Sequence, residues 1–427
     1  MPRSVIVVGG SLAGLMHALQ LKRQGNNVTI LEQDPSSERS SNEAGIAFRA
    51  YCEEFLTKYD DTGVTVCVPI SRTRIGWRTR PQLLSFALSM RLTSWGHLYR
   101  VLRANFDGYA SKAVPVPPPS RPGDGRGQYL VGKRAVGLSY NEQSGIVTVR
   151  YVDFSTGKEE QMTADLVIGA DGIHSTVRNL IGVHTVKEYA GYVAWRGTVP
   201  EKLLSQETLE YFTSCVNANT MKRSYAITYV IPTDDGNFEP GERLINFVWY
   251  YNIAEGSPEM DRVLTDINGV HHRNTVPRGL VQPEEWARVR ETMLPHMAAP
   301  FAELVSKNDS PFVTKIHDAR ITSPPTCHNG RVILVGDALT TLRPHSGSAS
   351  EQAAFHCLRL PRVWDLETDL KDWVTQVDFY THRLYLLSRA IGELGQGSAF
   401  SFFKSLFSYV ACLLSALWYG KPKPSSR

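Results

Sequence analysis

The hydrophobic pattern of the chain differs between its N-terminal part and its middle. At the start, an apolar run at Val5–Val8, a helical repeat from Leu12 to Gln24 and a second apolar run at Val28–Leu31 predict a strand, a helix and a strand. From Ala190 to Ile253, alternating residues separated by turn-rich segments predict a mostly antiparallel sheet. We therefore expect an α/β fold that opens with a βαβ unit and carries an inserted, mostly antiparallel β domain.

The later part of the chain has a helical pattern. Residues 283–306 and 349–395 are predicted to be helical, and apolar residues near the C-terminus again recur at helical spacing. The uncharged run there has 15 residues, Ser405–Tyr419, which is shorter than the roughly 20 that span a bilayer. We expect this last helix to dock on the body of the protein. The alternative is an interfacial membrane anchor, with Lys421 and Lys423 beyond it.

Composition and charge exclude several classes of protein. The 427 residues carry a formal net charge of +4 without a Lys/Arg cluster, so we expect no nucleic-acid binding. The six cysteines show no CxxC or CxxH spacing, which argues against a metal site or a disulfide framework. The N-terminus enters a strand directly and lacks the apolar stretch of a signal peptide. We therefore expect a cytoplasmic protein, with peripheral membrane association through the C-terminal tail as the alternative.

The first chemical motif lies between the two N-terminal strands. Gly9, Ser11 and Gly14 occupy the three positions of a dinucleotide-binding G-x-G-x-x-G, with serine replacing the middle glycine. Such a corner allows a tight turn, and the N-terminus of the following helix then faces a pyrophosphate. Glu32, at the end of the second strand, is placed to accept hydrogen bonds from both ribose hydroxyls. Because an acid there disfavours a 2′-phosphate, NAD or FAD fits better than NADP.

A second corner of this kind lies in the segment DLVIGADGIHSTVR. An apolar strand runs into Asp171-Gly172 and then into a helix that carries Arg178. The corner can be a plain strand-to-helix turn in which Asp171 caps the helix. It can also be one more pass of backbone beside the same dinucleotide, with Arg178 fastening the corner by a salt bridge. The residues leave both interpretations open.

The third motif lies in the stretch RVILVGDALTTLRPHSGSASEQAA, where an apolar strand delivers Gly336-Asp337. A metal site would need more ligands than Asp337 and His345 provide, and a nucleophile site lacks a G-x-S-x-G elbow. A cradle for a large anionic cofactor fits better, because the carboxylate can accept hydrogen bonds from a polyol such as ribitol. The segment from Ser348 to Glu351 predicts a capping box for a helix whose N-terminal amides face a cofactor carbonyl.

These three motifs, in this order, resemble those of the class A flavoprotein aromatic monooxygenases, the p-hydroxybenzoate hydroxylase-like superfamily. That family carries GxGxxG, DGxxSxxR and GDAxHxxxP, which correspond to Gly9–Gly14, Asp171–Arg178 and Gly336–Pro344. The stretches TSWGHLYRVL, YAGYVAWRGTVPE and VPRGLVQPE are similar to the 2,6-dihydroxypyridine 3-hydroxylase branch in particular. Departures from the family pattern that bear on flavin position and redox tuning are Trp95, Leu339, Thr340, Ala349 and Glu351.

The resemblance implies a Rossmann-like, glutathione-reductase-type FAD-binding domain with an inserted β substrate domain and a C-terminal helical segment. FAD would be the cofactor, and NAD(P)H a transient co-substrate without a Rossmann domain of its own. The expected ranges are 1–72, 90–182 and 310–360 for the FAD-binding domain, 73–89 and 183–309 for the substrate domain, and 361–427 for the helical segment. The FAD contacts that the resemblance implies are Gly9, Ser11, Leu12, Gly14, Glu32, Gln33, Asp171, Gly172, Arg178, Gly336, Asp337, Pro344, Ala349 and Ser350.

The implied reaction is hydroxylation of a small, electron-rich aromatic or heteroaromatic ring by O2, through a flavin C4a-hydroperoxide and with NAD(P)H as reductant. Activation of the ring by deprotonating its hydroxyl calls for an acid/base group near the flavin. His345 is the first candidate, because its loop should pass the isoalloxazine beside Pro344. Tyr225, Tyr229 and Arg49 are further candidates, although half-buried strand tyrosines and a surface arginine are the plainer interpretation of these three.

Other functions remain open at this point. An enzyme of the same fold could catalyse epoxidation, dearomatisation or dehydrogenation in secondary metabolism. A flavin-dependent halogenase is a weaker alternative, because VAWRGTVP lacks the first Trp and the Ile of a WxWxIP motif. A non-catalytic binding module would purify without flavin. The partners we expect are a small aromatic substrate and O2, together with a homodimer.

Overall fold

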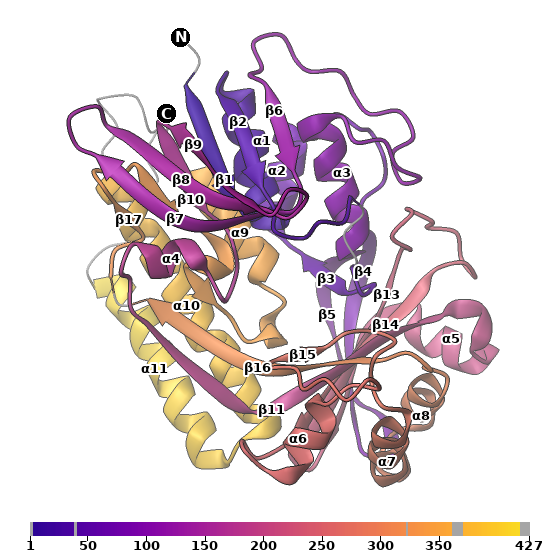
Figure 1. Cartoon of the computed structure of the whole chain (residues 1–427). Coiled ribbons are helices and arrows are strands. Elements are labelled where there is room, and N and C mark those ends of the chain that lie inside the picture. Colours follow the sequence, from indigo (N-terminus) through magenta and orange to yellow (C-terminus); the bar gives the residue numbers. More distant parts are fainter. Residues whose placement is uncertain (1–2, 38–40, 322, 361–369, 419–427) are drawn as a thin grey trace.

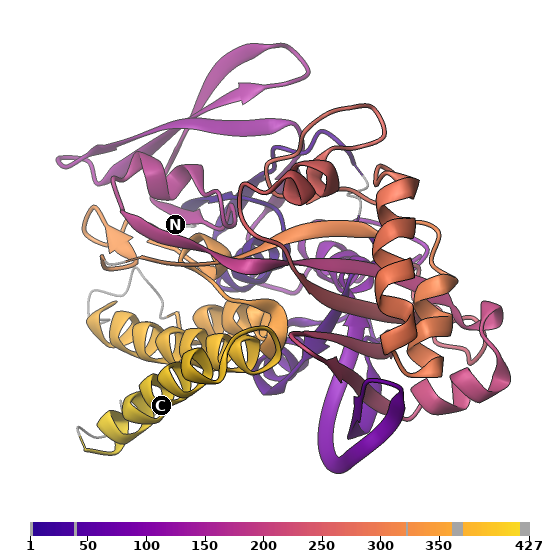
Figure 2. The same ribbon diagram turned by 90° about the horizontal axis from the view of Figure 1, so that it is seen from below.

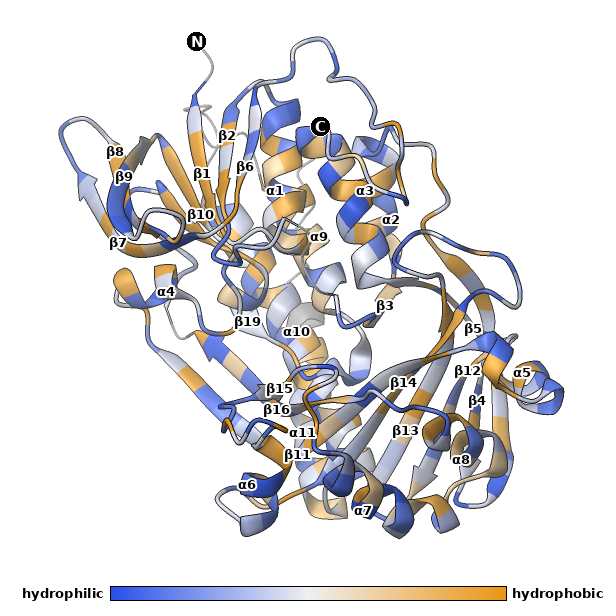
Figure 3. Ribbon diagram, turned by 45° about the vertical axis from the view of Figure 1, so that its right-hand side comes forward, coloured by the Kyte–Doolittle hydropathy of each residue, from blue (hydrophilic) through white to orange (hydrophobic). Residues whose placement is uncertain are grey.

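The computed structural model describes residues 3–37, 41–321, 323–360 and 370–418. A six-stranded sheet in the order β17-β18-β10-β1-β2-β6 forms one part of the molecule (Figure 1). Its central strands β1, β10 and β18 are almost continuously apolar and buried (β1 and β10 in Figure 3), as expected of a parallel sheet that is covered on both faces. All neighbours are parallel except β17 and β18. The strands are β1 (Ser4–Val8), β2 (Asn27–Leu31), β6 (Gly127–Leu130), β10 (Leu166–Gly169), β17 (Thr326–Cys327) and β18 (Val332–Leu334).

Helices cover one face of this sheet and a small antiparallel sheet covers the other (Figure 1). The βαβ opening is confirmed to within a residue at each end, since β1, α1 and β2 follow one another as predicted. The helices are α1 (Leu12–Arg23), α2 (Ala50–Tyr59), α3 (Trp95–Asp107) and α9 (Ala349–Arg359); the small sheet is β7 (Lys133–Asn141), β8 (Ile146–Asp153) and β9 (Lys158–Ala164).

A second, ten-stranded sheet has the order β15-β16-β11-β14-β13-β12-β4-β5-β3, with β19 also paired to β16. All its pairs are antiparallel except β12 with β4. The predicted mixture of a parallel and a mostly antiparallel sheet is therefore confirmed. The strands are β3 (Gly45–Phe48), β4 (Val68–Trp77), β5 (Arg80–Ser94), β11 (Thr185–Pro200), β12 (Cys215–Met221), β13 (Ser224–Ile231), β14 (Leu244–Asn252), β15 (Thr275–Val276), β16 (Phe312–Ile321) and β19 (Thr340–Thr341).

The two faces of the ten-stranded sheet have different partners. On one face, Trp195 and Trp249 of the sheet are buried against Trp286 of a covering helix. The opposite face carries Tyr192 and Tyr225 and turns toward the loop that follows β18. The covering helices are α5 (Gln206–Phe212), α6 (Pro258–Leu264), α7 (Pro283–Met293) and α8 (Ala299–Ser306), and single 3-10 turns are η1 (Glu201–Leu203), η2 (Leu294–His296), η3 (Gly336–Ala338) and η4 (Pro344–Ser346).

Two long helices, α10 (Leu370–Gln396) and α11 (Ala399–Trp418), close the chain, and the short α4 (Thr176–Leu180) follows β10. Figure 2 shows α11 lying along α10 at the periphery of the molecule, as the docking prediction requires. Lys421 and Lys423, which the anchor alternative invoked, lie outside the described residues. Among the helices that the structure describes, none is long and apolar enough to cross a membrane.

Candidate cofactor and substrate site

The three sequence motifs meet at one edge of the parallel sheet. Strands β18, β10 and β1 are neighbours, so the loops that follow their carboxyl ends lie side by side. The backbone joins them directly: Ala170 N donates to Val8 O (2.8 Å) and Val335 N donates to Gly169 O (3.0 Å). This is the edge at which open α/β sheets bind their ligands.

The first corner requires its glycines. Gly9 has a φ of +100°, and a Cβ there would lie 2.6 Å from the carbonyl oxygen of Ala170. A Cβ at Gly14 would collide with the carbonyl oxygen of Gly9. Ser11 is the N-cap of α1, but its hydroxyl makes no capping hydrogen bond. Leu12 is buried beneath the turn, so the N-terminal amides and the Ser11 hydroxyl form a donor set for an anion.

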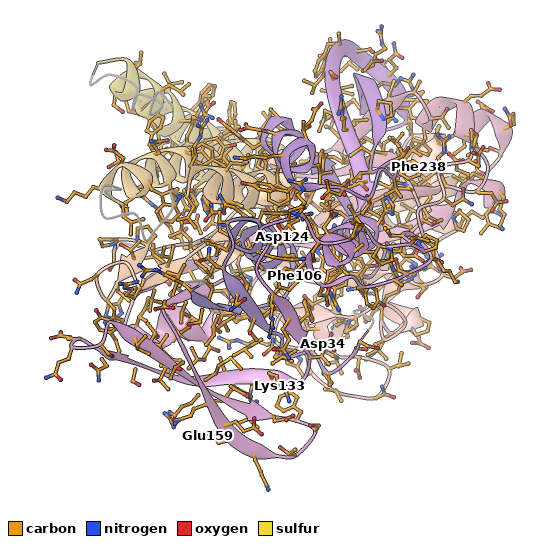
Figure 4. All side chains as sticks on the ribbon, turned by 90° about the horizontal axis from the view of Figure 1, so that it is seen from above. Asp34, Phe106, Asp124, Lys133, Glu159 and Phe238 are labelled. Carbon is orange, nitrogen blue, oxygen red and sulfur yellow. The ribbon has the colours of Figure 1, made fainter. Side chains whose placement is uncertain are left out.

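Glu32 is buried beside this corner. One carboxylate oxygen accepts from Gly10 N (2.8 Å), and the other accepts from the N–H of Asp34 (2.9 Å), which is labelled in Figure 4. Gln33, between them, is exposed. Sequence reasoning missed Tyr129 of β6, whose hydroxyl donates to Gly10 O (3.0 Å). The corner is thus fixed from two strands at once.

The second corner is a capped helix start. The carboxylate of Asp171 accepts from Thr176 N (2.6 Å), Val177 N (3.1 Å) and the Ser175 hydroxyl (2.5 Å). Asp171 thus binds the first amides of the helix, but the N-cap is Ser175, whose hydroxyl accepts from Arg178 N (3.0 Å), and not Asp171 as the capping interpretation held. Burial raises the pKa of Asp171, and these hydrogen bonds oppose that rise. Gly172 has a φ of +76°, which suits a tight turn.

The predicted salt bridge of Arg178 is wrong. Its guanidinium donates instead to the carbonyl oxygens of Ala338 (2.9 Å) and Ile173 (2.7 Å). The Asp171 carboxylate already accepts hydrogen bonds from the start of α4, and the Arg178 guanidinium donates to two neighbouring loops instead. Through Ala338, Arg178 fastens the second motif to the third.

Asp337 stands out in the third motif. Gly336 packs its backbone against Ala13 in the first turn of α1 and has a φ of +56°. The neighbouring Asp337 carboxylate makes no hydrogen bond to any other residue that the structure describes. Burial raises its pKa to about 6. A carboxylate held this way is suited to accept hydrogen bonds from hydroxyl groups of a ligand.

Pro344 in the loop before α9 and Ala349 at the start of α9 are exposed. The predicted capping box is wrong: the N-cap Ser348 makes no side-chain capping bond, and Glu351 accepts instead from Tyr51 N (3.0 Å) and Cys52 N (3.1 Å) at the start of α2. The negative charge of Glu351 therefore stabilises the N-terminus of α2 rather than that of its own helix. The Ser350 hydroxyl donates to Ala47 O (3.1 Å) and ties α9 to β3.

His345 lies between two tyrosines. Its Nε2 is 2.5 Å from the Tyr192 hydroxyl, and its Nδ1 makes a short hydrogen bond with the Tyr225 hydroxyl. Burial, together with the nearby Arg343, lowers the pKa of His345 to about 3, so the imidazole is neutral. The structure thus brings together His345 and Tyr225, which were predicted as separate candidates. Tyr192 was missed because it lies 153 residues away in sequence.

Two further candidates occupy different surroundings. Arg49 is exposed and donates to Ser346 O (2.7 Å), so it supports the His345 loop. Tyr229 shares a strand face with Tyr225, and its ring packs against Gly45 of β3, where a Cβ would lie 2.6 Å from a ring carbon. Burial raises the pKa of Tyr229.

Arg343 anchors the His345 loop to the long helix α10. Its Nε donates to Asp318 (2.7 Å) on β16, and another nitrogen donates to Glu393 (2.9 Å) on α10. Arg343 and Asp318 are almost completely buried. Gly392 lets α10 approach closely, since a Cβ there would lie 2.7 Å from Nε2 of His345. A buried, fully paired network of this kind fixes a geometry more than it adds stability.

Arg196 is a second residue that sequence reasoning missed. It lies on β11 four residues after Tyr192 and therefore on the same face of the sheet. Among the described residues its guanidinium has no hydrogen-bond or ion-pair partner, and its buried Nε is unsatisfied. The guanidinium lies over the ring of Phe312, 5.2 Å from its centroid, and its charge also acts on Tyr229 and Tyr250. The alternation of Tyr192, Ala194 and Arg196 within YVAWRG was the available signal.

Comparison with known proteins fits this arrangement. Residues 4–53 match the family model described as FAD binding domain, and residues 189–318 match the one described as FAD binding domain-like. Over 378 residues the chain is 30% identical to 2,6-dihydroxypyridine 3-monooxygenase of Paenarthrobacter nicotinovorans, covering 87% of this chain and 86% of that protein. The chain belongs to the class A FAD-dependent monooxygenases.

Two further relatives of this class A monooxygenase are informative. The solved structure of 2,6-dihydroxypyridine-3-hydroxylase from Arthrobacter nicotinovorans has a TM-score of 0.77 at 29% identity and covers 93% of this chain and 94% of that one. 6-Hydroxynicotinate 3-monooxygenase of Bordetella bronchiseptica is 23% identical over 382 residues, which are 88% of this chain and 86% of that protein. The class A monooxygenase is thus an FAD-dependent hydroxylase of aromatic or heteroaromatic compounds.

The residues present fit FAD. The glycine corner leaves an anion site at the start of α1, and Asp337 offers a carboxylate without a protein donor among the described residues. The exposed Pro344 and Ala349 follow that carboxylate in sequence, Pro344 in the loop and Ala349 as the first residue of α9. No group of three or more His, Cys, Asp or Glu side chains suited to a metal ion occurs in the part of the chain that the structure describes.

Proposed function

We propose that this class A monooxygenase hydroxylates a small aromatic or heteroaromatic ring that carries a negative charge, such as a phenolate, a pyridinolate or a ring carboxylate. The observation that carries the proposal is Arg196, a cation on the tyrosine-bearing face without a counter-ion among the described residues. A partly buried guanidinium left unpaired costs free energy, which an anionic ligand would recover. Two relatives, a dihydroxypyridine and a hydroxynicotinate monooxygenase, are named for rings of this acidic kind.

In this proposal FAD is held by the three corners. The N-terminal amides of α1 and Ser11 would bind the pyrophosphate, Glu32 the adenosine ribose, and Asp337 the ribitol. Pro344 and Ala349 would border the isoalloxazine. Bound FAD supplies the transfer of electrons from NAD(P)H to O2 and the delivery of one oxygen atom to the ring. The ring, O2, NAD(P)H and a proton thereby give the hydroxylated ring, NAD(P)+ and water.

The protein's part in the reaction is to orient the ring and to move its hydroxyl proton. Arg196 would hold the anionic group, and the Tyr225 hydroxyl would face the hydroxyl that activates the ring. His345, neutral and bonded through both nitrogens, would pass the proton between Tyr225 and Tyr192. Deprotonating the hydroxyl makes the ring a stronger nucleophile toward the oxygen atom it receives.

Arg196 gives the most direct test of the substrate class. In Arg196→Met we expect KM for the anionic substrate to rise about 10- to 100-fold with a smaller change in kcat, because a charge-assisted hydrogen bond is lost. Arg196→Lys should recover part of the loss. The measurement is substrate-stimulated NAD(P)H oxidation with 2,6-dihydroxypyridine, 6-hydroxynicotinate and salicylate as first probes, and with ¹⁸O2 to trace oxygen into the product.

The matched control is Arg126→Met, which removes an exposed arginine on the parallel-sheet side of the molecule. The proposed substrate class would be wrong if anionic rings and their neutral methyl ethers accelerated NAD(P)H oxidation equally and KM of Arg196→Met equalled that of the wild type. NAD(P)H oxidation without oxygen in any product would indicate an oxidase or dehydrogenase instead.

A cluster of cations beside the second corner is suited to the phosphates of NAD(P)H, and we infer that the transient nucleotide binds there. Lys187 of β11, Lys315 of β16 and Arg273 come together with His174, which follows Asp171-Gly172 in the chain. Partial burial and the neighbouring cations lower the pKa of both Lys187 and His174, and no acid opposes the effect. None of the three cationic side chains has an ion-pair partner within the described ranges. Positive charge concentrated in this way attracts polyanions.

Neutralising this cluster should weaken nucleotide binding selectively. Lys187→Gln and Arg273→Gln are each expected to raise KM for NAD(P)H about tenfold, since each removes one charged hydrogen-bond donor. KM for the aromatic substrate and the FAD content should not change. Lys222→Gln, an exposed lysine in the turn between β12 and β13, serves as the control. A rise in KM for NAD(P)H of the same size in Lys222→Gln, or none in either cluster variant, would contradict this assignment.

A further inference from the structure

Helix α11 exposes a continuous apolar stripe. Its members follow one another at spacings of three and four residues and therefore lie on one side of the helix. The exposed fractions of their side chains are large for residues of this kind. The stripe consists of Phe400 (80% exposed), Phe403 (65%), Phe407 (75%), Val410 (41%) and Leu414 (59%).

The body of the protein holds α11 loosely. None of the side chains that the structure describes in α11 is fully buried. A cavity of about 1110 Å³ lies between the helix and the body, lined among others by Val186, Val374, Phe379 and Cys412. A second cavity of about 360 Å³ separates α11 from α10 near Glu393. The helix thus rests on α10 along one side (Figure 2), while the side chains of the apolar stripe stay exposed.

The charge of this segment has a single sign. From Leu394 to Arg427 the sequence contains no Asp or Glu, whereas it contains the cations Lys404, Lys421, Lys423 and Arg427. Lys404 is exposed next to Phe403, at the border of the apolar stripe. An apolar helix face bordered by cations has the chemistry of a segment that inserts into the headgroup region of an anionic lipid surface.

We propose that α11 binds the surface of an anionic lipid bilayer, with the apolar stripe inserted and Lys404 at the headgroups. The helix would lie in the interface plane, because none of the helices that the structure describes is long and apolar enough to cross a membrane. The enzyme would then be held at a membrane while its catalytic site, on the other side of α10, stays in water.

A second copy of this chain is the competing occupant of the apolar stripe, since its spacing also suits a helix pair. Charge argues against it. Pairing of α11 with itself would bring two sets of cations together in a segment that offers no acid to neutralise them. An anionic membrane supplies that neutralisation.

The test is flotation of the full-length, FAD-loaded protein with vesicles of phosphatidylcholine alone or of phosphatidylcholine with phosphatidylserine. We expect binding to the phosphatidylserine vesicles, weakening as salt is raised, and little binding to the neutral ones. The double variant F403S/F407S should lose at least about tenfold in vesicle affinity, because two large apolar side chains are removed. F154S/L203S, which changes two exposed apolar residues outside α11, should bind like the parent.

Lys404→Glu leaves the apolar stripe intact and should weaken binding about fivefold or more by reversing one charge. Equal flavin absorbance per chain in all variants shows that the fold and the FAD site are unaffected, which separates this test from any failure of the proposed reaction. Absence of binding to phosphatidylserine vesicles would overturn the proposal. So would a dimer in sedimentation velocity that F403S/F407S dissociates while vesicle binding stays unchanged.

Discussion

Replacing His345 with alanine is expected to lower kcat for hydroxylation by about 10²- to 10⁴-fold while FAD stays bound. The imidazole bridges Tyr192 and Tyr225, and its pKa of about 3 keeps it neutral at any working pH. A neutral imidazole donates through one nitrogen and accepts through the other. It can therefore take a proton from one hydroxyl as it returns one to the other, and alanine interrupts that path. Stopped-flow measurement should show a slower hydroxylation step after normal flavin reduction.

Several variants separate this role from a packing effect. Tyr192→Phe and Tyr225→Phe should each lower kcat, and added imidazole should restore part of the rate only in His345→Ala. Gly392→Ala adds a methyl group 2.7 Å from Nε2 and should also lower kcat, although it removes no polar group. His296→Ala, at an exposed site, is the control. Wild-type kcat in both His345→Ala and Gly392→Ala would contradict the proton path.

The wild-type pH profile follows from the same geometry. Because burial and Arg343 lower the pKa of His345, kcat should show no inflection from this imidazole near its ordinary value. Any inflection in that range then belongs to the substrate hydroxyl or to another group.

Local sequence sufficed for those parts of the site that depend on backbone conformation. A glycine at residue 9 or 336 indicates a positive φ, and the apolar run before it indicates the strand that precedes the turn. Three such corners imply neighbouring parallel strands, because ligands bind where the carboxyl ends of those strands meet. For this reason the position of Asp337 was predictable from the motif that contains it.

Side-chain partners across long sequence separations were not predictable. Glu351 could have capped its own helix, and only the packing of α9 on α2 turns it toward Tyr51 and Cys52. The sequence shows that Arg178 is charged but not which group it binds. In the folded protein its guanidinium donates to carbonyl oxygens rather than to Asp171. Tyr192 resembles any strand tyrosine until the third motif brings His345 against it. The proton path therefore depends on contacts that a local pattern does not contain.

Replacing Asp337 with asparagine should have opposite effects on the protein with and without FAD. With FAD, we expect the dissociation constant to rise about 10- to 100-fold, because a charged hydrogen-bond acceptor for the ribitol becomes a neutral one. Flavin fluorescence during titration of the apoprotein measures this change. Asp309→Asn, an exposed acid in the loop before β16, is the control and should bind FAD normally.

Without FAD, the same substitution should stabilise the protein, and the sign follows from the pKa. Burial raises the pKa of Asp337 from 3.8 to about 6, so the folded apoprotein keeps a proton that the unfolded chain loses. The wild-type free energy of unfolding therefore falls as pH rises from 3.8 to about 6, and above that pH the whole cost of the buried charge is present. A neutral asparagine side chain carries no such cost. The free energy of unfolding of the Asp337→Asn apoprotein should therefore exceed that of the wild type by about 1–2 kcal/mol above pH ~6 and should equal it below pH ~4. This difference is smaller than the full pKa shift implies because the carboxylate is partly exposed. Urea unfolding of both apoproteins across this range measures the difference; a gain that does not depend on pH would show that the carboxylate is not the cause.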